Sequence, residues 1–172
     1  MGKIIFIDID GPLAWGTWKD GRVKITEGPN GKLEIPYPWV QEDCDALNNI
    51  IQKTDAQLVV SSDWRKHYGF NQLKAIFLHY GIANWNLLDT TTNFNPSKKL
   101  SSSPVWDRAC EIHNWVKCFK PKNWIAIDDM VLNHHFKSLK VPQWRHIQVD
   151  GDWGQGGKLR DKVDECIDKL NR

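Results

Sequence analysis

The stretch Lys3–Leu13, KIIFIDIDGPL, decides the fold of this chain. It opens with a short apolar run rich in β-branched residues, which predicts a buried strand. Two carboxylates, Asp8 and Asp10, follow at once, and the pair Gly11-Pro12 then turns the chain. Acids at the carboxyl end of a buried strand lie where open α/β sheets bind ligands. Two neighbouring buried acids need a cation, and their oxygens suit Mg²⁺. A strand ending in a polar turn is the simpler interpretation of this stretch alone.

A second strand is followed by acids in the same way. The apolar run Trp124–Ile127 leads directly into Asp128 and Asp129. If both strands lie in one sheet, their acids meet at one edge, and a cluster of carboxylates there requires a metal ion. We therefore expect the carboxyl groups of residues 8, 10 and 129 to meet around one divalent ion.

A third predicted strand, Gln57–Val60, is followed by small hydroxyls, Ser61 and Ser62, and then by two cations, Arg65 and Lys66. Hydroxyls and cations after a buried strand suit a phosphate oxygen. Serines also begin helices as caps, and both roles are compatible because helix N-termini bind anions.

The rest of the chain alternates between helix and strand patterns. Apolar spacing predicts helices over 38–54, 70–80, 106–119 and 159–170, a strand over 145–149, a turn or short helix over 131–139 and a long polar loop over 84–103. This alternation predicts an α/β fold, with a mostly parallel sheet and helices on both faces. A length of 172 residues predicts one domain over 1–172.

Residues 15–38 look like an insertion after the first acids. Arg22–Ile25 and Lys32–Ile35 alternate polar and apolar residues around a Gly-Pro-Asn-Gly turn, which predicts a β-hairpin. The hairpin is either a flap over the site or an ordinary surface hairpin.

Composition and charge bear on the class of protein, on its cellular environment and on its partners. The net charge of +2 does not demand a polyanionic partner, and the four cysteines lack metal or disulfide spacing, which favours a reducing cytoplasm. No apolar run has the length of a signal peptide or a membrane span, so we expect no membrane partner. Of the ten tryptophans, Trp15, Trp18 and Trp64 lie near the motifs, where each is either a stacking surface for a base or part of the core.

Taken together, these motifs resemble the haloacid dehalogenase (HAD) superfamily of phosphohydrolases. The resemblance rests on Asp8-Ile9-Asp10-Gly11, on Ser61 and on Asp128-Asp129, each after a strand, with a basic residue before the last motif. The segments VVSSDWRK and RACEIHNW are similar to small HAD domains of RNA-repair proteins and of polynucleotide kinase–phosphatase. The resemblance implies a Rossmann-like HAD core in which the hairpin replaces a cap domain.

The resemblance also implies roles. Asp8 would be the nucleophile that forms an aspartyl-phosphate, Asp10 the general acid and base, and Ser61 a ligand of the phosphoryl group. Mg²⁺ would be held by Asp8, by Asp129 and by Asp10 through its backbone carbonyl. Asp128 and Ser62 would contact and position these residues without binding the metal or the phosphoryl group themselves.

The basic residue of the motif would be Arg108, with Lys98 or Lys99 as alternatives. Arg108 lies in the first turn of a predicted helix, where cations are disfavoured, so a bound anion is one explanation and a solvent-facing side chain is the other. Two residues depart from the superfamily pattern: Pro12 replaces the usual Thr or Val, and Arg replaces the commoner Lys.

The function expected from this reasoning is a Mg²⁺-dependent phosphomonoesterase acting on a nucleotide or a nucleic-acid end. The alternatives are a phosphatase for a non-nucleotide metabolite or a phosphoprotein, and a HAD-fold binding module without turnover. The intact pair Asp8 and Asp10 argues against the binding module, which could lose either acid.

Overall fold

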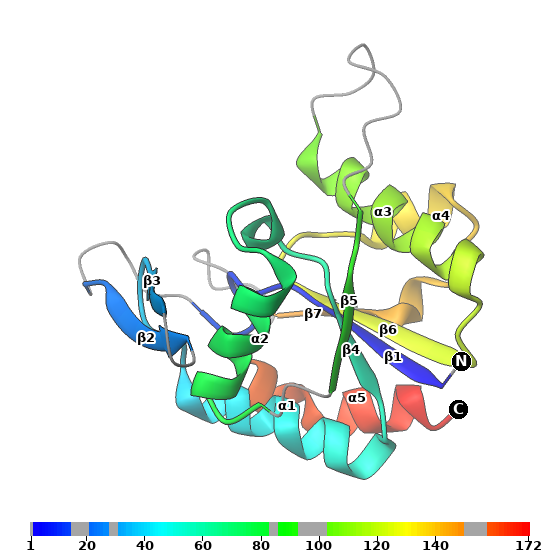
Figure 1. Ribbon diagram of the computed structural model, residues 1–172. Helices are drawn as coiled ribbons and strands as arrows, with labels where there is room; N and C mark the ends of the chain where they lie inside the picture. The colour runs from blue at the N-terminus through cyan, green and yellow to red at the C-terminus, as the bar shows by residue number, and fades with distance from the viewer. Residues whose placement is uncertain (1, 15–20, 28–30, 83–85, 93–102, 150–157) are drawn as a thin grey trace.

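A parallel five-stranded sheet forms the centre of the computed structural model, which describes residues 2–14, 21–27, 31–82, 86–92, 103–149 and 158–172 (Figure 1). The strand order is β5-β4-β1-β6-β7. The strands are β1 (Lys3–Ile7), β4 (Gln57–Val60), β5 (Leu87–Thr90), β6 (Asn123–Asp128) and β7 (His146–Gln148). All four neighbouring pairs are parallel, which confirms the predicted α/β class.

Helices cover both faces of this sheet (Figure 1). They are α1 (Gln41–Thr54), α2 (Phe70–His79), α3 (Pro104–Phe119), α4 (Asn133–Ser138) and α5 (Val163–Leu170), with short 3₁₀ turns η3 (Asp63–Lys66), η5 (Gln143–Arg145) and η6 (Leu159–Lys162). Because side chains alternate along a strand, β1 supplies Ile5 and Ile7 to the core beneath α1, α2 and α5. It supplies Ile4 and Phe6 to the core beneath α3 and α4.

The predicted hairpin is present as β2 (Val23–Glu27) and β3 (Gly31–Ile35). The two strands are antiparallel, with Ile25 opposite Leu33. Both side chains are buried in the core that α1 and α2 share, so the hairpin is anchored to the body of the molecule. It stands beside α2 in Figure 1.

The structure differs from the sequence-based expectation by one additional strand and by shifts at the ends of several elements; α3, for example, begins at Pro104 and β7 spans His146–Gln148. Strand β5 lies within the segment predicted as a loop, and its four residues are too few to show a clear pattern. Helix α1 begins at Gln41 because Val40 is extended and donates its N–H to the Leu13 carbonyl at 2.8 Å. The last predicted helix begins with the 3₁₀ turn η6.

Among the described residues, no helix combines the length and the apolar character needed to cross a membrane.

Candidate active site

The predicted site residues lie at the carboxyl ends of three neighbouring strands. In the register of the sheet, Ile7 of β1 is paired with Val60 of β4 and with Ile127 of β6. The Asp8 N–H donates to the Ile127 carbonyl at 3.0 Å, and the Ser61 N–H donates to the Ile7 carbonyl at 2.9 Å. These two hydrogen bonds extend the sheet by one residue and fix Asp8 beside β6 and Ser61 beside β1.

Three carboxylates converge at this edge. Asp8, Asp128 and Asp129 each present one oxygen, and these oxygens lie within 4.8 Å of one another. Burial raises the pKa of Asp129 to about 6, and the negative charge of Asp8 adds to the rise. Burial also raises the pKa of Asp128, although the charge of Arg108 opposes it. The electrostatics of the cluster therefore favour a bound cation.

Within the described part of the chain, Arg108 is the cation that contacts the cluster. Its side chain is 4% exposed, and its Nη1 lies 3.0 Å from Asp8 Oδ2 and 2.8 Å from Asp128 Oδ2. Burial would lower the pKa of this guanidinium, but the charges of Asp8 and Asp128 outweigh burial and hold it above its ordinary value. Arg108 therefore faces the carboxylates rather than the solvent. Because α3 begins at Pro104, Arg108 lies just beyond the first turn, and its burial is offset by two ion pairs.

Gly11 allows the two acidic segments to approach each other. Its φ of +91° lies in the left-handed region, and a Cβ built there would lie 2.6 Å from Asp129 Cβ. Any side chain at this position would have to displace Asp129. The turn after β1 can therefore pack this closely against Asp129 only if position 11 is glycine.

Asp10 lies at the site but outside the carboxylate cluster. Its Oδ1 accepts hydrogen bonds from the Tyr37 hydroxyl and from Trp64 Nε1, the latter at 2.9 Å. Burial raises the pKa of the Asp10 carboxyl, although the two hydrogen bonds oppose the rise. Its carboxyl group is thus directed toward the hairpin side and held by two fixed donors.

Ser61 offers a hydroxyl that the described part of the chain does not use. The residue is 1% exposed, and its Oγ has no hydrogen-bond partner among those residues. A buried polar atom is rarely left without a partner in a folded protein, so this hydroxyl is suited to a ligand. Ser62 has a structural role instead, because its Oγ accepts the Trp64 N–H at 3.4 Å and begins η3.

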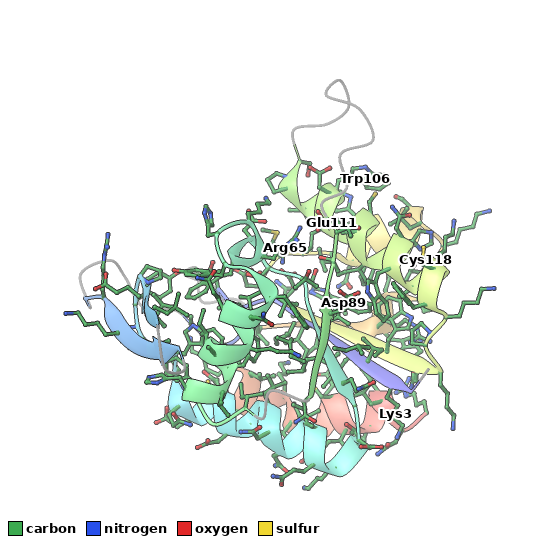
Figure 2. The ribbon with its side chains drawn as sticks, viewed as in Figure 1. Lys3, Arg65, Asp89, Trp106, Glu111 and Cys118 are labelled. Atoms are coloured by element: carbon green, nitrogen blue, oxygen red, sulfur yellow. The ribbon has the colours of Figure 1, made fainter. Side chains whose placement is uncertain are left out.

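A buried ion pair supports the serine segment. Arg65 donates to the carboxylate of Glu111, and its Nη1 also donates to the Ser62 carbonyl at 2.5 Å. Figure 2 shows Arg65 and Glu111 close together, where η3 meets α3. The pair links the segment that bears Ser61 to the helix that bears Arg108.

The structure thus brings together Asp8, Asp128, Asp129 and Arg108, with Ser61 on the neighbouring strand. Asp128, expected behind the site, is inside the cluster, whereas the Asp10 carboxyl is outside it. Lys98, Lys99, Trp15 and Trp18 lie outside the described residues. Of the two cations suggested for a phosphate oxygen, Arg65 instead pairs with Glu111 and Lys66 with Asp63. Sequence reasoning missed Tyr37 and Glu111, because their partners are distant in sequence and no local pattern indicates them.

The donor set fits a magnesium ion. Carboxylate and carbonyl oxygens are the ligands that this hard cation prefers, and the cluster offers only carboxylates. With a metal beside a buried hydroxyl and a guanidinium, the arrangement is able to bind a phosphoryl group and neutralise its charge.

A family model described as the HAD domain in Swiss Army Knife RNA repair proteins matches residues 4–154. No curated protein and no solved structure gives a significant match to the chain.

Proposed function

Because the chain belongs to the HAD family found in Swiss Army Knife RNA repair proteins, we propose that it is a Mg²⁺-dependent phosphomonoesterase. It would act through an aspartyl-phosphate on a nucleotide or a nucleic-acid end. The observation that carries the proposal is the position of Asp8, which belongs to the carboxylate cluster and contacts Arg108 at 3.0 Å. The guanidinium of Arg108, together with a metal ion bound by the cluster, would offset the charge of this carboxylate as it approaches an anionic phosphate.

Asp8 and Asp129 would hold Mg²⁺ with their carboxylates, and Asp10 would contribute its backbone carbonyl. Bound there, Mg²⁺ would neutralise negative charge so that the Asp8 anion can approach an anionic phosphate. Asp128 would serve mainly to hold Arg108, because it is 1% exposed while Asp129 is only half-buried. An ion that keeps several water ligands needs the more accessible partner.

The first step would be attack by the Asp8 carboxylate on phosphorus, with loss of the leaving oxygen. The Ser61 hydroxyl would donate a hydrogen bond to a phosphoryl oxygen, and Arg108 would orient Asp8. Asp10 would give its proton to the leaving oxygen as the P–O bond breaks. Its raised pKa supports this role, because the carboxyl group must be protonated when the reaction begins.

In the second step a water molecule would attack phosphorus, and the bond between phosphorus and Asp8 would break. Asp10 would accept the proton of that water and so return to its starting state. Two donors bind its Oδ1, so Oδ2 is the oxygen suited to carry the proton in both steps.

The proposal is tested by phosphate release with and without Mg²⁺. Wild-type protein should hydrolyse p-nitrophenyl phosphate only with Mg²⁺, and Asp8→Asn should abolish turnover while the protein stays folded by circular dichroism. Asp168→Asn, the same change at an exposed position of α5, should keep the wild-type rate. Turnover by Asp8→Asn, or no turnover by the wild type on any phosphoester, would contradict the proposal, and the second result would favour a binding module.

The substrate class is tested with a panel. Rates on 3′- and 5′-phosphorylated oligonucleotides are compared with rates on mononucleotides, sugar phosphates and phosphopeptides. We expect nucleotide-containing substrates to be preferred, in line with the RNA-repair family. Equal and poor rates on all of them, with a fast rate elsewhere, would favour the metabolite or phosphoprotein alternative.

A further inference from the structure

A cavity of about 480 Å³ lies between the β2–β3 hairpin and η3, with Asp10 in its lining. We propose that this cavity holds the nucleoside of the substrate, with its aromatic base against the rings of Tyr37, Trp64 and Tyr68. The proposal rests on the proposed phosphatase function and adds to it a binding site and a class of leaving group.

The position of Asp10 supports this assignment. If Asp10 protonates the leaving oxygen, the leaving group must lie next to Asp10, on the side away from the metal cluster. The cavity meets that requirement, because Asp10 lines it and the residues of the cluster do not. Its volume falls within the range of small-molecule sites and is large enough for a base and a ribose.

The aromatic lining favours a flat, apolar ligand. Trp64 lies between Tyr37 and Tyr68, with ring centroids 5.9 and 5.4 Å away, respectively. The Tyr68 hydroxyl donates to the Glu34 carbonyl at 3.1 Å, and the Tyr37 hydroxyl donates to Asp10. These bonds hold two of the rings in place before a ligand binds, which lowers the entropic cost of stacking.

The charges of the lining favour a neutral ligand. Among the lining residues that the structure describes, the guanidinium of Arg22 is paired with Glu34 at 3.3 Å, and Asp63 is paired with Lys66 at 2.8 Å. Asp10 would carry the proton for the leaving oxygen, and these described residues offer no unpaired guanidinium to hold a second anionic group. Carboxylate oxygens also accept hydrogen bonds from the amino groups of a base and the hydroxyls of a ribose. A nucleoside meets both conditions, whereas a second phosphate group does not.

The test compares adenosine 5′-monophosphate with ribose 5-phosphate, which carry the same phosphoester and differ by the base. We expect wild-type kcat/KM to favour the nucleotide. Tyr68→Leu should lower the ratio of the two kcat/KM values roughly 5- to 100-fold, the scale of one lost base-stacking contact. Tyr68→Phe keeps the ring and loses only the hydrogen bond to Glu34, so it should lower the ratio much less than Tyr68→Leu and shows whether the ring or the hydroxyl matters.

Phe70→Leu is the matched control. Phe70 is aromatic, 36% exposed at the start of α2 and outside the cavity lining, so its loss should not change the ratio. Equal kcat/KM on both substrates in the wild type, or an equal ratio in Tyr68→Leu, would overturn the cavity assignment and leave the phosphatase proposal standing.

A binding measurement separates the two proposals. Calorimetric titration of adenosine into Asp8→Asn protein needs no turnover, and we expect binding that Tyr68→Leu weakens and Phe70→Leu does not. If no phosphoester is hydrolysed, the phosphatase proposal fails, and this titration alone decides the cavity. Binding that depends on Tyr68 would then support the nucleoside site, and no binding would overturn it.

Discussion

At the scale of single residues, the site depends on how closely two turns approach each other. Gly11 follows the first acidic pair, and its Cα faces the Asp129 side chain across a gap that no Cβ could occupy. The position of Asp129, and with it the proposed metal site, therefore depends on a residue that makes no polar contact with the metal. The same glycine turns the chain with a positive φ after β1, so it serves both the backbone and the site.

This dependence predicts that Gly11→Ala impairs Mg²⁺ binding. The added methyl group would clash with Asp129 Cβ at 2.6 Å and displace its carboxylate. Mg²⁺ should raise the melting temperature of the wild-type protein, because a ligand that binds only the folded state stabilises it. We expect that rise to disappear in Gly11→Ala.

Gly81→Ala is the control for backbone strain. Gly81 also has a positive φ, +77°, but a Cβ there meets no atom within 4 Å. Both variants should lose about 1–2 kcal/mol of unfolding free energy from the left-handed conformation. Only Gly11→Ala should lose the response to Mg²⁺, and an unchanged response in that variant would argue against Asp129 as a ligand.

At the scale of elements, the segment that follows the β2–β3 hairpin contacts Asp10, the proposed general acid and base, through the hydroxyl of Tyr37. Tyr37 lies two residues beyond the end of β3, and its hydroxyl donates a hydrogen bond to Asp10. The hairpin is therefore not only a surface feature, because the residues at its end contact the proposed general acid and base. Trp64 of η3 donates to the same oxygen, so two elements hold Asp10 together.

Tyr37→Phe should therefore slow the reactions that need an acid. Without the hydroxyl, the Asp10 carboxyl group loses one of the two hydrogen bonds that orient it, so its proton is less well placed for the leaving oxygen. We expect kcat to fall roughly tenfold or more for alkyl phosphates, the scale of a hydrogen bond to a charged group. The loss should shrink for p-nitrophenyl phosphate, whose leaving group needs little protonation.

Tyr68→Phe is the matched control for this prediction. It removes a hydroxyl that also contacts the hairpin, but its partner is the Glu34 carbonyl and not Asp10. Its effect should not depend on the basicity of the leaving group. An equal loss on all leaving groups in Tyr37→Phe would show that the hydroxyl serves only stability.

At the scale of the whole molecule, the order of the strands explains which features the sequence could predict. Parallel strands place their carboxyl ends at one edge of the sheet. Once the α/β class was recognised, the acids at the ends of β1 and β6 and the serine after β4 could therefore be expected to lie close together. The contacts of Tyr37 with Asp10, and of Arg65 with Glu111, join residues 27 and 46 positions apart. Such contacts depend on how the hairpin, η3 and α3 pack, and no local periodicity encodes that packing.

The two-layered core could also be predicted from the sequence, because of the side chains of β1. The alternation of Ile4–Ile7 between two buried faces requires layers on both sides of β1, and the sequence supplied amphipathic helices for each. Strand β5 was not predictable, because a short segment at the edge of the sheet is defined by its pairing with β4 and not by its own pattern.

The central claim is that Asp8 becomes covalently phosphorylated. The most direct test is acid quenching of the protein during turnover of a good substrate, followed by mass spectrometry of its peptides. The peptide that bears Asp8 should carry one phosphoryl group that hydroxylamine removes, and Asp8→Asn should carry none. With p-nitrophenyl phosphate, whose leaving group needs little protonation, Asp10→Asn should retain more of the label, because the phosphoryl group still transfers to Asp8 while the base that activates water is missing. A wild-type protein that turns over substrate while Asp8 remains unmodified at every quench time would contradict the account.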